Sequence, residues 1–206
     1  MALTDTLKAL ASDTEQVVIA AYRSYLEGLI DRDDTVALIA QAIAEANGRA
    51  RSLADMAVAA QVMIELQEPV PVSGVEYPND VPRLQKAADT VLTVAEGSEV
   101  PEAIIGRLAR SEPLEAAAST YSDAMVRSGV TKGWVRQKSA SACQLCEWWW
   151  RSGRVWPAEH PFQHHKGCTC TPKVVLKKGI KETGYTRRLR NEQAMEAINN
   201  YARRNR

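Results

Sequence analysis

The stretch from residue 141 to residue 171 constrains this chain most, because it holds every cysteine and every histidine of the protein. Cys143 and Cys146 form a C-x-x-C pair, and His165, Cys168 and Cys170 follow as H-x-x-C-x-C. A C-x-x-C turn directs two thiolates at one point, and a second short group from a distant loop can complete a tetrahedron around zinc. The spacing therefore predicts a structural zinc site.

The ligand set is only partly determined by the spacing. We expect Cys143, Cys146 and Cys168 to be three of the four ligands, with either His165 or Cys170 as the fourth. An even number of cysteines also permits two disulfides. However, a chain of 206 residues does not need such cross-links, and the cysteines are expected to be reduced in the cytosol. A third alternative, four buried free thiols that bind no metal, does not explain why the cysteines occur in closely spaced pairs.

Four short elements of this region follow one another in a defined order. They are GWVR at 133–136, CQLC at 143–146, SGRVW at 152–156 and HKGCTCTP at 165–172. In these elements the chain resembles the C-terminal zinc-binding segment of the phage Mu F-like minor head proteins of tailed bacteriophages. The resemblance covers about residues 130–175. It implies a minor head protein that lies inside the head near the portal.

Charge is unevenly distributed along the chain. Residues 173–206 hold ten of the 26 basic and three of the 25 acidic residues, so this part has a net charge of +7 and the rest has −6. A basic tail on an acidic body is typical of a protein whose tail binds an anionic partner, such as nucleic acid or an acidic protein face. A tail that is only solvated is an equal alternative. The sequence contains no run of about 20 apolar residues, the length that a membrane helix needs. The first residues also lack the pattern of a secretory signal.

Hydrophobic periodicity predicts a mainly α-helical N-terminal body, elongated or bundled, over residues 1–129. We expect helices over 3–30, 34–65, 80–96 and 99–128, with Pro113 restarting or kinking the last of these. Residues 67–80 contain three prolines and a glycine, so they are predicted to be a linker. The linker is either a surface connection or an arm that touches a neighbouring subunit.

The period changes after residue 130, which predicts a small β module over residues 130–178 and a basic tail over 179–206. Strands are expected at 131–137, 153–156 and 172–176, and a last helix at 186–204. Three short strands bury little apolar surface, so bound zinc would supply folding energy for the module. The predicted fold is thus a helical body, a zinc-stapled β module and a C-terminal helix.

Two further groups of side chains are candidate contact sites. Trp148, Trp149 and Trp150 cannot all face one way in a strand, so we expect them to combine packing with an interface role rather than to stack on bases. The tail carries six arginines that could contact phosphate groups without reading sequence: Arg187, Arg188, Arg190, Arg203, Arg204 and Arg206.

The motifs favour a protein without enzymatic activity. The chain has no glycine-rich phosphate loop, no H-E-x-x-H and no G-x-S-x-G. Glu147 and Glu159 lie near the cysteines, but the H-x-E and P-C-x-x-C order of zinc deaminases is absent.

The resulting hypothesis is a structural protein of a phage head. It would assemble in the host cytoplasm and then lie in the head interior, acting in procapsid assembly or DNA packaging. Its partners would be the portal or the major capsid protein, with packaged DNA at the basic tail and no small-molecule substrate. The alternative is a zinc-containing nucleic-acid-binding protein, such as a phage regulator, that uses the same tail.

Overall fold

The computed structural model describes residues 3–140, 142–178 and 180–204. This part of the chain is mainly helical with one small sheet, as predicted. Its helices are α1 (Leu3–Leu26), α2 (Arg32–Leu66), α3 (Val81–Glu96), α4 (Pro101–Arg127), α5 (Gln144–Trp150) and α6 (Gly184–Arg204). Its strands are β1 (Gly133–Gln137), β2 (Val155–Pro157) and β3 (Thr171–Val175).

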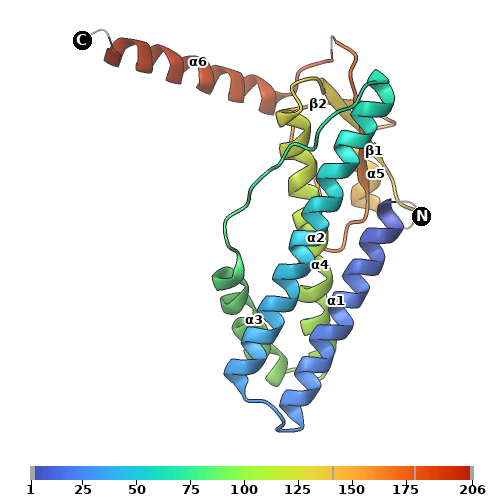
Figure 1. Cartoon of the computed structure of the whole chain (residues 1–206), viewed down its shortest axis with the longest axis vertical. Coiled ribbons are helices and arrows are strands. Elements are labelled where there is room, and N and C mark those ends of the chain that lie inside the picture. Colours follow the sequence, from blue (N-terminus) through green and yellow to red (C-terminus); the bar gives the residue numbers. More distant parts are fainter. Residues whose placement is uncertain (1–2, 141, 179, 205–206) are drawn as a thin grey trace.

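Helices α1, α2 and α4 run side by side along the long axis of the molecule, and α3 packs against α2 and α4 (Figure 1). Small buried residues of α2, among them Ala40, Ala50 and Ala54, allow close contact between helices. The predicted first helix was too long, because α1 ends at Leu26 and Gly28 then takes a positive φ of 71° in the turn. The Asp31 carboxylate caps α2 by accepting a hydrogen bond from the Asp34 N–H (2.8 Å).

The predicted restart at Pro113 is wrong, because α4 continues through this residue as one helix. Proline removes the single N–H that would bond to the carbonyl four residues earlier. Ala109, Leu114 and Ala117, on both sides of it, are buried in the helix bundle. Tertiary packing along the whole length of α4 therefore outweighs the lost hydrogen bond.

The proline-rich linker is fastened to the helices. The Asp55 carboxylate of α2 accepts hydrogen bonds from the Ser73 and Gly74 N–H groups, both at 2.9 Å. Tyr77 donates to Asp123 (2.8 Å), and its ring lies under the Arg51 guanidinium, 4.3 Å from the ring centroid. These contacts make the linker a surface strap along α2 and α4.

Asp55→Ala is expected to destabilise the protein by about 2 kcal/mol, because two hydrogen bonds to a charged acceptor are lost. Urea denaturation measures this loss, and protease cleavage within residues 67–80 should accelerate in parallel. Asp13→Ala, an exposed position on α1, is the matched control and should change stability by no more than about 0.5 kcal/mol. Equal stability of the two variants would contradict the assigned role of Asp55.

The sheet is antiparallel with the strand order β2-β1-β3. Trp134 pairs with Trp156 across β1 and β2, and their rings stack with centroids 5.9 Å apart. Trp134 and Val174 belong to the same buried cluster as Val58 of α2, so the sheet and the helices share a core. The predicted strands overlap the observed ones, with β2 and β3 displaced by one or two residues.

Helix α6 extends away from the rest of the molecule (Figure 1). At its start the Thr183 hydroxyl accepts from the Thr186 N–H (3.1 Å), and the Thr186 hydroxyl accepts from the Thr183 N–H (3.0 Å). This reciprocal capping fixes where the helix begins. Every residue from 191 to 200 is exposed. None of the helices that the structure describes is long and apolar enough to cross a membrane.

Candidate metal centre

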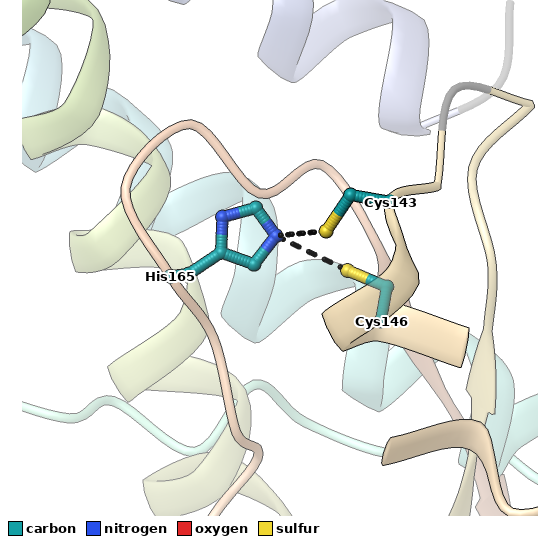
Figure 2. A group of neighbouring side chains, drawn as sticks. All are labelled: Cys143, Cys146 and His165. Atoms are coloured by element: carbon teal, nitrogen blue, oxygen red, sulfur yellow. Dashed lines mark hydrogen bonds between the residues drawn. The ribbon is translucent and has the colours of Figure 1, made fainter. Parts of the chain in front are cut away.

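Two elements bring the cysteines and one histidine together. Cys143 is the N-cap residue of α5, and Cys146 lies buried in its first turn. His165, Cys168 and Cys170 come from the loop that leads into β3. This loop turns at Gly167, where φ is +76° and the Cys168 N–H bonds to the His165 carbonyl (2.9 Å). Figure 2 shows the two thiols of Cys143 and Cys146 pointing at the imidazole of His165.

Three distances between neighbouring donor atoms are close to those in a tetrahedral metal site. His165 Nε2 lies 3.2 Å from the sulfur of Cys143 and 3.2 Å from that of Cys146, while the sulfurs of Cys146 and Cys168 are 3.6 Å apart. Metal bonds of about 2.0–2.3 Å place neighbouring ligand atoms about 3.5–3.8 Å apart in a tetrahedron. A disulfide would require about 2.05 Å between sulfurs. All four cysteines are free thiols.

Five side chains compete for four positions. The donor atoms form two groups, Cys143 with Cys146 and His165, and Cys146 with Cys168 and Cys170. The cluster can therefore hold a metal ion, with Cys146 common to both groups. The position of His165 between two thiols favours it as a ligand, and the open choice moves to Cys168 or Cys170.

The hydrogen bonding of His165 prepares its ring for a metal. Its Nδ1 lies 2.9 Å from the Lys166 carbonyl oxygen, which can only accept a hydrogen bond. The proton therefore lies on Nδ1, and Nε2 presents a lone pair to the two thiols. Such a second contact commonly fixes the tautomer of a histidine that binds a metal. The Trp149 ring stacks against His165, with centroids 6.1 Å apart.

Arg136 is a buried cation beside the sulfurs, and the sequence analysis missed it. Its side chain is 1% exposed, donates to the Gln163 carbonyl and places Nη1 3.9 Å from Cys168 Sγ. No ion pair joins it to a carboxylate in the described ranges. An uncompensated buried charge costs several kcal/mol. Thiolates around a metal ion would provide the missing negative charge.

The protonation of the thiols is adjusted by their surroundings. The backbone N–H of Cys146 lowers the pKa of Cys143 at the start of α5. Burial raises the pKa of Cys146 to about 11. A hydrogen bond with Cys168 lowers the pKa of Cys170, and Arg136 lowers it further. Metal binding would therefore have to displace a proton from Cys146, which makes the affinity increase with pH.

The three consecutive tryptophans lie in α5, a helix that was not among the predicted elements. Trp148 is 62% exposed, whereas Trp149 and Trp150 are half-buried. Trp149 covers the ring of His165, and the Lys138 ammonium lies 3.9 Å from the centroid of Trp150. Trp148 is the member of the three that remains available for a partner.

Five of the six predicted arginines of the tail lie in α6, apart from the cluster along the chain. Arg187 and Arg190 form ion pairs with Glu182 at the base of the helix. Arg188, Arg203 and Arg204 are exposed and form no ion pair within the described residues. Arg206 lies outside the described residues.

The remaining polar groups of the region lie apart from the sulfurs. His160 stacks on Trp156, and its Nδ1 lies 3.1 Å from the Thr183 hydroxyl. Glu147 pairs with Lys138 (2.5 Å), and Glu159 lines a cleft beside α6. Within the described part of the chain, the two donor groups contain thiols and one imidazole without a carboxylate.

Comparisons with known proteins identify no relative of this chain. No protein-family model, no curated protein and no solved structure matches the chain.

Proposed function

We propose that the cluster holds a structural zinc ion. Thiolate and imidazole ligands in tetrahedral geometry suit zinc, and four protein ligands leave no open position for a substrate. The ion would tie α5 to the loop before β3. It would thereby fix the β module against the helices, in agreement with the core that the two share.

We further propose that the chain is a non-enzymatic minor structural protein of a tailed-phage head. The observation that supports this proposal is that the residues carrying the resemblance to Mu F-like proteins, 143–146 and 165–170, come together in three dimensions. In this role the protein lies in the head interior beside the portal. The helical body contacts portal or capsid protein, and the exposed α6 meets DNA or an acidic partner during assembly or packaging.

A second candidate is a zinc-containing nucleic-acid-binding protein. It is favoured by three exposed cations of α6 that form no ion pair with any described residue, Arg188, Arg203 and Arg204. Contacts of these side chains with phosphate would be independent of sequence and sensitive to salt.

Sedimentation distinguishes the two candidates. A structural role predicts that the full chain co-sediments with procapsids built from the portal and capsid proteins of its own phage. It also predicts that the chain does not bind free duplex DNA at physiological salt. The triple variant Arg188→Ala/Arg203→Ala/Arg204→Ala should remain with the procapsids. Association with free DNA that the triple variant abolishes, without binding to procapsids, would support the second candidate and contradict the first.

A further inference from the structure

An open cleft of about 500 Å³ lies between α1, α4 and the loop that follows His165. Its charged side chains come from all three elements: Lys8 and Glu15 from α1, Arg107 and Arg110 from α4, and Lys166 from the loop. Hydroxyl groups of Ser12, Ser111 and Thr169 also line it. A concave site in which cations and hydroxyl donors converge has the chemistry required by an oxyanion.

The cations of the cleft are only partly neutralised by the protein. Arg110 lies 3.2 Å from Glu15, and Lys166 lies 2.9 Å from Glu115. Lys8 and Arg107 have no ion-pair partner within the described ranges of the chain. The cleft therefore keeps an excess of two positive charges.

The walls of the cleft are held in place by the packing of α1 on α4. The Glu15 carboxylate lies directly over Gly106, where an added Cβ would be 2.5 Å from its Oε1. This contact keeps Glu15 beside Arg110 and so orients the guanidinium. Ser111 is 2% exposed and so forms part of the buried wall of the cleft.

We propose that this cleft binds a phosphate group, a role separate from the metal centre and from the arginines of α6. Guanidinium groups match phosphate oxygens with paired hydrogen bonds, and lysines add point charges. A volume of about 500 Å³ is within the range of ligand sites, so a nucleotide-sized group fits. Because the cleft is open, the phosphate belongs either to a strand of nucleic acid or to a free phosphate compound.

The test uses the full zinc-loaded chain and two probes, a short single-stranded DNA and inorganic phosphate. The variant Lys8→Ala/Arg107→Ala removes the two unpaired cations. Its matched control, Arg49→Ala/Lys86→Ala, removes the same charge from two exposed, unpaired positions outside the cleft. Circular dichroism verifies that both variants fold. The cations of α6 are present in both, so the difference between them reports on the cleft.

The cleft variant should bind DNA at least about tenfold more weakly than the control. The slope of log binding constant against log salt concentration should become shallower by about 1.4, the value for two lost phosphate contacts on a single strand. Binding of inorganic phosphate that is lost only in the cleft variant, without DNA binding, would assign the site to free phosphate. Equal binding by the two variants, or no binding of either probe by the wild-type chain, would overturn the proposal.

Discussion

Replacing Cys146 with serine is expected to reduce the affinity for zinc by about 100- to 1000-fold. Structural zinc sites contribute about 10–16 kcal/mol of binding free energy, and the variant loses roughly a quarter of it. Cys146 has the largest expected effect because its sulfur belongs to both donor groups. At fixed free zinc, the apparent stability should fall by the same free energy. Competition with a coloured zinc chelator measures the affinity, and denaturation in buffered zinc measures the stability.

The neighbouring residue provides the control for this experiment. Glu147 lies next to Cys146 in α5, but its carboxylate pairs with Lys138 outside the cluster. Glu147→Gln should therefore keep full zinc affinity. A site in which Glu147→Gln weakens zinc binding as strongly as Cys146→Ser would not be the site described above. A parallel loss in Cys168→Ser but not in Cys170→Ser would assign the remaining ligand position to Cys168.

Arg136→Met is expected to lower zinc affinity by about 10- to 100-fold, although Arg136 does not bind the metal. Groups that contact metal ligands typically have effects of this size. The guanidinium is buried beside Cys168 and lacks a carboxylate partner in the described ranges, so the negative charge of metal-bound thiolates is its natural complement. The rise in melting temperature on adding zinc should shrink accordingly.

Arg154→Met is the matched control for this prediction. The Arg136 guanidinium lies over the Trp149 ring, 5.3 Å from its centroid, and the Arg154 guanidinium lies likewise over Trp156, at 4.4 Å. Within the described residues, Arg154 makes no contact with the sulfurs. The zinc affinity of the Arg154→Met variant should stay within about twofold of wild type, because Arg154 does not contact the metal ligands. If Arg136→Met and Arg154→Met change zinc binding equally, charge compensation at the cluster is not the role of Arg136.

The donor cluster and most of the helices could be predicted from the sequence because their signals are local. The C-x-x-C and H-x-x-C-x-C spacing identified the five residues that converge, and apolar periodicity identified the helices of the body. The choice among the five could not be made, because it depends on loop geometry at Gly167 and on the hydrogen bond between His165 and the Lys166 carbonyl. Neither appears in the spacing.

The features that were missed depend on tertiary packing. Helix α5, which contains the three tryptophans, was not among the predicted elements. It begins at Cys143, and Trp149 stacks on His165 of the neighbouring loop. Pro113 suggested a break, which packing of α4 overrides. Arg136 did leave a signal, since alternation in β1 puts it on the same face as the buried Trp134.

The central claim, a zinc ion that joins α5 to the loop before β3, is tested most directly by native mass spectrometry of the full chain combined with thiol counting. The account predicts one zinc ion per chain and three zinc-bound thiols that react quickly only after chelation. A chain without metal whose thiols react at once, or whose cysteines are paired in disulfides, would contradict it.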